Sequence, residues 1–188
     1  MKTETHLDLA IYLRNKHLYN RSTLDKAAFV VGCVEPDVNL CSYLKGFNLR
    51  PFFGHNWENA EKYILNCAEK TERGHMGYLG MGRFVHYICD AFTFPHNKAY
   101  RDGLSKHTLY EKRLHTRVLE YCSRDESMDF QKPSTHLGDW VESLHKRYCR
   151  IAPSEETDAK FIFFAADCVV SRWVEQTAKL PETAIGRL

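Results

Sequence analysis

The sequence predicts an all-α protein, built as a single-domain multi-helix bundle, and two observations carry this prediction. Apolar residues recur at spacings of three and four through most of the chain, which is the period of an amphipathic helix. No convincing pair of segments alternates apolar and polar residues as neighbouring strands do. No internal repeat, low-complexity tract or long Gly/Ser linker divides the 188 residues, so we expect one domain spanning 1–188.

The expected helices follow one another closely along the chain. The first, 4–17, places Leu7, Ala10 and Leu13 on one side. A second is expected to end before residues 32–37, and the segment 78–93 is so apolar that it belongs in the interior. In the last helix, Pro153-Ser154 marks the start, with acidic residues in its first turn. Helical spacing recurs over 57–70, 104–123, 137–150 and 156–179, and the segments 46–56 and 95–103 are expected to be loops.

Bulk properties exclude few classes of function. A net charge of +2 is too small to indicate nucleic acid or an acidic membrane as partner. The N-terminus does not resemble a secretory signal, and no window approaches the roughly 18 to 20 apolar residues of a transmembrane segment. Seven scattered cysteines without a Cys-x-x-Cys pair indicate reduced thiols. We therefore expect a cytoplasmic protein; the oligomeric state is not indicated.

The middle of the chain carries a metal-binding pattern. His86 and Asp90 stand four residues apart within the apolar segment, so both side chains share one helix face. A buried aspartate needs an ionic partner or a metal. His96 follows beyond Pro95, and His107 and Glu111 repeat the four-residue spacing. Such pairs also arise by chance, so the order of all the polar residues matters more than either pair.

That order resembles a known family. Thr5-His6-Leu7 opens the first helix, Gly32-Cys33-Val34-Glu35-Pro36-Asp37 comes next, and Gly54-His55-Asn56-Trp57 opens a third helix. The two His-x-x-x-acid pairs and His96 follow. This succession is similar to the zinc-dependent phospholipases C of Gram-positive bacteria and, more distantly, to the fungal single-strand nucleases. The resemblance runs from residue 5 to about 112.

The resemblance implies a role for each residue. His55, His86 and Asp90 would bind one zinc ion, and His6 with the other oxygen of Asp90 would bind a second. His96, His107 and Glu111 would bind a third. Asp37 matches the family's carboxylate that hydrogen-bonds the metal-bound water. Secreted members complete the His6 site with an N-terminal tryptophan; here the Met1 amine, or a water molecule, would take that place.

The ligand types indicate the chemistry independently. Nitrogen and oxygen ligands without thiolate suit catalytic zinc, which lowers the pKa of bound water to about 7. Two or three zinc ions would support in-line attack of zinc-bound hydroxide on phosphorus, with Asp37 orienting or deprotonating the water. The substrate would be a phosphate ester, a phospholipid head group or another phosphodiester. A single-strand nuclease acting on nucleic acid, a nucleotidase-like phosphatase and a non-catalytic zinc-binding protein remain alternatives.

Two further expectations concern the surroundings of the site. Asp167 lies within an apolar helical run and could accept the second ring N–H of a zinc-bound histidine. Aromatic residues near the ligands could line a pocket for an acyl chain, stack on a base, or belong to the core: Phe52, Phe53, Trp57, Tyr87, Phe92 and Phe94.

Overall fold

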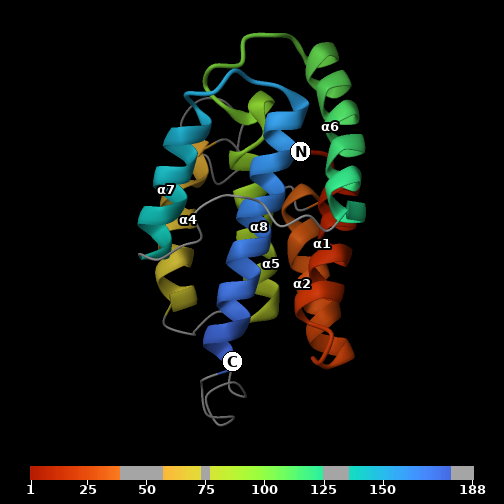
Figure 1. The fold of residues 1–188 in the computed structure, drawn as a ribbon, viewed down its shortest axis with the longest axis vertical. Coiled ribbons are helices and arrows are strands. Elements are labelled where there is room, and N and C mark those ends of the chain that lie inside the picture. Colours follow the sequence, from red (N-terminus) through yellow and green to blue (C-terminus); the bar gives the residue numbers. More distant parts are fainter. Residues whose placement is uncertain (39–56, 73–76, 125–135, 179–188) are drawn as a thin grey trace.

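The computed structural model describes residues 1–38, 57–72, 77–124 and 136–178, and the regular secondary structure within these ranges is entirely helical. This confirms the predicted fold class. Figure 1 shows the helices as an elongated bundle, with α8 in front of α5 near the middle. The helices are α1 (Thr3–His17), α2 (Thr23–Val38), α4 (Trp57–Glu72), α5 (Tyr78–Ala91), the short 3₁₀ helix η1 (Phe94–His96), α6 (Leu104–Arg124), α7 (Leu137–Tyr148) and α8 (Glu155–Thr177).

Helix α5 lies in the interior, as its apolar sequence predicts. It packs against α2, α8 and α4, and its side chains Met81, Phe84 and Ile88 are fully buried. Helix α8 supplies the facing apolar surface through Phe161, Val169 and their neighbours. A helix surrounded in this way must satisfy any polar group it carries inside the protein, which sets the conditions for the metal centre.

Two glycines let α2 and α5 approach backbone to backbone. A Cβ atom on Gly82 would collide with the carbonyl oxygen of Phe29, and one on Gly32 would collide with the carbonyl oxygen of Leu79. Only hydrogen fits at both positions. The close approach brings the last turns of α2 beside the α5 face that carries His86.

The segment 32–37 was expected to follow a helix, and this expectation is wrong. Helix α2 continues to Val38 and contains Pro36. Proline removes one hydrogen bond from a helix; here it lies in the last turn, with its ring buried, so packing offsets that loss. As a consequence Asp37 is held on a helix rather than on a turn.

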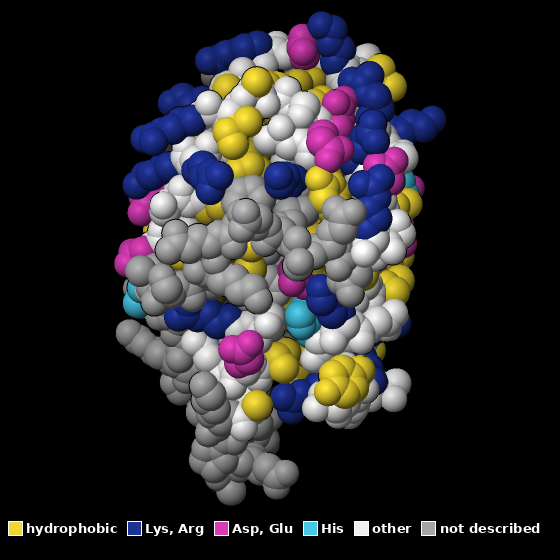
Figure 2. Space-filling model, viewed as in Figure 1, with side chains coloured by type: hydrophobic (Ala, Val, Ile, Leu, Met, Phe, Trp, Pro, Cys, Tyr) yellow, Lys and Arg dark blue, Asp and Glu magenta, His cyan; other side chains and the backbone are white. Residues whose placement is uncertain are grey.

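The other expected boundaries agree closely with the structure. Ser154 caps α8 by accepting a hydrogen bond from the backbone N–H of Thr157. The loop expected over 95–103 begins with the final residues of η1, while the loop over 46–56 lies outside the described residues. Among the helices that the structure describes, none has the length and apolar character needed to cross a bilayer. Figure 2 shows charged side chains of both signs over the described surface of one face.

Candidate metal centre

Five helical elements bring six of the expected ligands, and the expected catalytic residue Asp37, together in two adjacent groups. In each group the potential ligand atoms lie within 4.8 Å of one another. Both groups offer nitrogen and oxygen only, and they comprise His6, Asp37, His86 and Asp90 in the first and His96, His107 and Glu111 in the second. Helices α1, α2 and α5 supply the first group, whereas η1 and α6 supply the second.

Asp90 lies at the centre of the first group and uses its two oxygens for different partners. Oδ1 lies 3.2 Å from Nε2 of His6, while Oδ2 lies 3.3 Å from Nε2 of His86. Oδ2 is also 3.6 Å from Nδ1 of His96, which connects the two groups. The carboxylate is fully buried. This arrangement is suited to a carboxylate shared between two cations.

The His86 ring is fixed by the backbone of α2. Its Nδ1–H donates to the carbonyl oxygen of Cys33 over 2.9 Å, so in the neutral ring Nε2 carries the lone pair, on the side that faces the two carboxylates. Nε2 is 3.6 Å from Oδ1 of Asp37. The His6 ring stacks on that of His86, with centroids 3.9 Å apart. The close packing at Gly32 and Gly82 therefore sets the position of a ligand.

The spacing of these atoms fits zinc. Tetrahedral zinc with bonds of about 2.0–2.1 Å separates its ligand atoms by about 3.3 Å. In the first group the shortest nitrogen–oxygen separations are 3.2 and 3.3 Å. In the second, Oε1 of Glu111 lies 3.1 Å from Nε2 of His96 and 3.2 Å from Nε2 of His107. These separations are compatible with a zinc ion in each group.

The amine of Met1 lies between the two groups. It donates to Oδ1 of Asp90 over 2.6 Å, and it lies 3.1 Å from Oε1 of Glu111 and 2.8 Å from Nε2 of His96. The amine is buried. A nitrogen in this position can serve as a ligand beside His6, as the sequence predicts, or as the positive charge that balances the carboxylates.

The electrostatics follow from burial and close contact. Burial alone would raise the pKa of Asp90, but the amine and the neighbouring histidines outweigh it and hold the pKa well below its usual range. Burial would likewise raise the pKa of Glu111, but hydrogen bonds from His107 and His96 outweigh it and lower that pKa. Burial, helped by the nearby His86, lowers the pKa of His6 to about 4. Asp90 and Glu111 are thus ionised and His6 is neutral at pH 7, as metal binding requires. Burial lowers the pKa of His86 and of the Met1 amine, but the neighbouring carboxylates outweigh it and raise both, so a metal ion would have to displace these protons.

The two groups differ in their access to solvent. His6, His86 and Asp90 are buried. The side chains of His107 and Glu111 keep 21% and 13% of their surface exposed, and that of Asp37 keeps 10%. Solvent therefore reaches the second group and Asp37, while the rest of the first group is enclosed by the protein.

The last helix supports the second group through Asp158. This buried carboxylate accepts three hydrogen bonds: from the backbone N–H of Phe94 over 2.7 Å, from the Tyr110 hydroxyl over 2.9 Å and from the Tyr148 hydroxyl over 2.7 Å. Phe94 begins the turn that ends in His96, and Tyr110 precedes Glu111. Asp158 thus fixes both elements that carry the second group.

Comparison with known proteins agrees with this geometry. The family model described as zinc-dependent phospholipase C matches residues 5–155, about four fifths of the chain. The chain belongs to this family. The match extends well beyond Glu111, through α7 and into the start of α8. No curated protein and no solved structure gives a significant match.

Two expected residues of the zinc-dependent phospholipase C site are not among the two groups described above. His55 is outside the described residues. Asp167 does pair with a histidine, as expected, but the partner is His17, 2.7 Å away, together with Lys16 at 3.2 Å. His17 is eleven positions after His6, about 16 Å along α1. The expectation that Asp167 supports a zinc-binding histidine is therefore corrected: it joins the far end of α1 to α8.

Sequence reasoning missed two residues that hold the site. Thr3 donates its hydroxyl to Oδ2 of Asp37 over 2.8 Å, and Asp158 is the anchor described above. Thr3 gave no signal, since its partner is 34 positions away. Asp158 was visible only as one of several acidic residues in the first turn of a helix, where the helix dipole is sufficient explanation.

Proposed function

We propose that this chain hydrolyses phosphodiesters at a zinc centre formed by the two groups, with two or three ions held by His6, His86, Asp90, His96, His107 and Glu111. The observation that carries the proposal is Asp90, a fully buried carboxylate whose oxygens face separate histidines. Family membership supports the zinc-dependent, phospholipase C-like role. His55 and the Met1 amine complete the proposed ligand set.

Zinc, when bound, supplies a Lewis acid and lowers the pKa of coordinated water to about 7. The protein's own contribution is to fix the ligands: α5 presents Asp90 and His86, and the backbone of α2 sets the tautomer of His86. Buried apolar side chains around α5 keep water away from the floor of the site. Such a dry, pre-arranged environment strengthens the electrostatic stabilisation of charge that develops on a phosphoryl group.

Asp37 is proposed to orient the attacking water and accept its proton. Thr3 holds one of its oxygens, while the other points toward His86 at a distance longer than those within the rest of the group. Asp37 is also partly exposed, so a substrate in solution can reach it. A carboxylate that is fixed yet accessible is suited to general-base chemistry. In-line attack on phosphorus would then follow, with the leaving oxygen near the second group.

Asp37→Asn tests this assignment. We expect activity on a phosphodiester such as bis(p-nitrophenyl) phosphate to fall about 10²–10⁴-fold, the usual contribution of a general base, with zinc content and fold unchanged. Thr3→Val is the companion variant, because it removes the hydrogen bond to the Asp37 carboxylate and keeps the carboxylate itself. It should lose less activity than Asp37→Asn. Loss of zinc together with activity in Asp37→Asn would make Asp37 a ligand instead, as its place within the first group also allows.

A substrate series separates phospholipase C-like action from its alternatives. A phospholipid with a short acyl chain, single-stranded DNA and a nucleoside monophosphate should be compared at equal concentration. We expect the phospholipid to be hydrolysed fastest. Faster turnover of DNA would assign the chain to nuclease chemistry, and zinc binding without turnover of any phosphate ester would assign it a structural role.

A further inference from the structure

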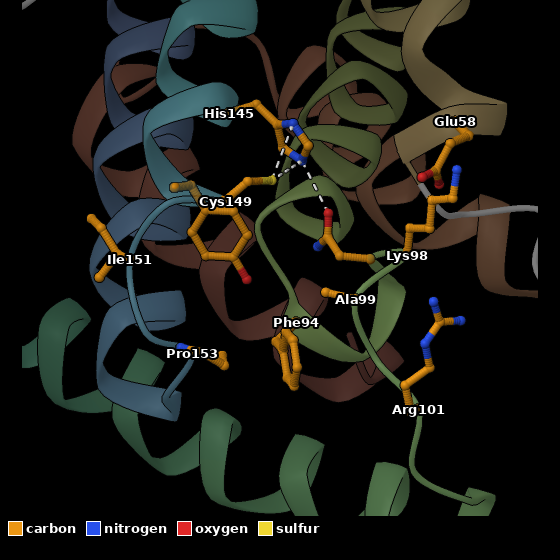
Figure 3. Close-up of a pocket in the computed structure, with 11 residues that line it drawn as sticks. Glu58, Phe94, Lys98, Ala99, Arg101, His145, Cys149, Ile151 and Pro153 are labelled. Atoms are coloured by element: carbon orange, nitrogen blue, oxygen red, sulfur yellow. Dashed lines mark hydrogen bonds between the residues drawn. The ribbon is translucent and has the colours of Figure 1, made fainter.

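A pocket of about 520 Å³ lies apart from the metal centre. Figure 3 shows it between the segment 94–101, the end of α7 and the connection from α7 to α8. Phe94 and Asn97 line it, whereas His96, which lies between them in sequence, contacts Glu111 and the Met1 amine. None of the proposed ligands that the structure describes lines this pocket. Residues 94–97 therefore contribute side chains both to the metal centre and to this pocket.

The walls of the pocket are apolar and fixed. Phe94, Tyr148, Ile151 and Pro153 provide the apolar surface. Two of these residues are held by Asp158, which accepts hydrogen bonds from the backbone of Phe94 and the hydroxyl of Tyr148. A volume in this range, with mainly apolar walls, is typical of small-molecule sites. Because the walls are already held in place, a ligand would spend little free energy on ordering them.

The polar side of the pocket is equally well ordered. Nε2 of His145 donates to Oδ1 of Asn97 over 3.0 Å, and the Asn97 amide donates to the carbonyls of Ala91 and Thr93. The His145 ring stacks on Trp57, with centroids 3.8 Å apart. Burial lowers the pKa of His145 to about 4, so the ring is neutral at pH 7. This wall offers hydrogen-bonding groups but no charge.

Among the described residues that line the pocket, the charged side chains lie at its rim. Lys98 and Arg101 are exposed, and neither forms an ion pair with a described residue. Nearby Lys106, in contrast, is paired with Asp102 at 2.8 Å. Figure 3 shows Lys98 and Arg101 on the same side of the pocket as Glu58, the acidic residue among those that line it. Two unpaired cations against one carboxylate leave the rim positive.

We propose that this pocket binds a single-chain amphiphile with an anionic head. The chain lies against Phe94, Tyr148 and Ile151, and the head lies between Lys98 and Arg101. None of the described zinc ligands lines this pocket, so we expect it to bind its ligand without zinc. A negative binding result would therefore leave the proposed catalytic function untouched, and the reverse also holds.

Calorimetric titration of zinc-free protein in EDTA tests the proposal, with three probes below micellar concentration. Octyl phosphate carries both chain and anionic head, octyl glucoside has the same chain with a neutral head, and inorganic phosphate is the head alone. We expect octyl phosphate to bind one per chain, octyl glucoside about tenfold more weakly, and phosphate below detection. Equal affinity for the two octyl compounds, or binding only after zinc is restored, would overturn it.

Variants locate the binding. Lys98→Ala combined with Arg101→Ala should weaken the binding of octyl phosphate about tenfold, and Glu58→Gln should strengthen its binding about two- to threefold. Lys106→Ala, an exposed cation with its own partner, is the matched control and should change nothing. Ala99→Trp places a large side chain at an exposed position lining the pocket and should abolish binding. Unchanged affinity in Ala99→Trp would show that the amphiphile binds elsewhere.

Discussion

Asp158 gives the sharpest test of how the structure supports the site. Burial raises its pKa to about 7, despite three hydrogen bonds that favour the ionised form, while the unfolded chain has a value of about 3.9. The folded protein thus holds this proton more tightly. The stability that Asp158 contributes is fully present below about pH 4 and is lost as pH rises through about 7. Between pH 5 and 7.5 the loss is about 2–3 kcal/mol.

Asp158→Asn removes this titration while keeping an oxygen that can accept from Phe94 and Tyr110. Urea unfolding of both proteins in EDTA, at about pH 5 and about pH 7.5, should show the variant gaining about 2–3 kcal/mol relative to wild type at the higher pH. Glu142→Gln, on α7, is the control: its ion partner is Lys146, and lysine stays charged throughout this range, so its effect should not change. If the difference in unfolding free energy between Asp158→Asn and wild type were equal at both pH values, the raised pKa of Asp158 would be refuted.

Three further predictions concern packing, the N-terminus and the buried histidine. Gly82→Ala should destabilise the protein by about 1–3 kcal/mol in urea unfolding, because its Cβ meets the Phe29 carbonyl; Gly103→Ala, whose Cβ meets nothing, should have little effect. A Gly-Ser extension before Met1 should weaken zinc binding in elemental analysis, whereas the same extension at the C-terminus should not; equal zinc contents would exclude the amine as a ligand. The folded-state pKa of His145 is about 4, so wild type should lose roughly 2–3 kcal/mol as pH falls from about 6.5 to 4.5, and thermal unfolding of His145→Gln should lack this loss.

The parts of the site that lie close together in sequence could be predicted. His86 with Asp90 and His107 with Glu111 share helix faces because four residues make about one turn. The apolar character of 78–93 gave the position of α5 in the interior, and with it the need for Asp90 to have partners. The adjacency of η1 and α6 to this helix could not be derived from spacing, and came from the family's order of motifs.

The supporting contacts could not be predicted, for a physical reason. Asp158 meets Phe94 and Tyr110 across 64 and 48 residues, and no local pattern encodes such a meeting. Asp167 shows the opposite error: an acidic residue in an apolar run was expected beside the metal centre, yet α8 is long enough to place it at the far end of α1. The end of α2 was predicted too early, because tertiary packing holds this helix through residues 32–37, including the proline in its last turn.

The central claim is that the two groups of ligands bind zinc, and metal content per chain tests it most directly. Elemental analysis of purified protein should give two or three zinc ions per chain. His86→Ala should lower that number, while Lys106→Ala, an exposed substitution away from both groups, should leave it unchanged. Absence of zinc from the wild-type protein, even after incubation with the metal, would contradict the account, as would a zinc content that His86→Ala does not alter.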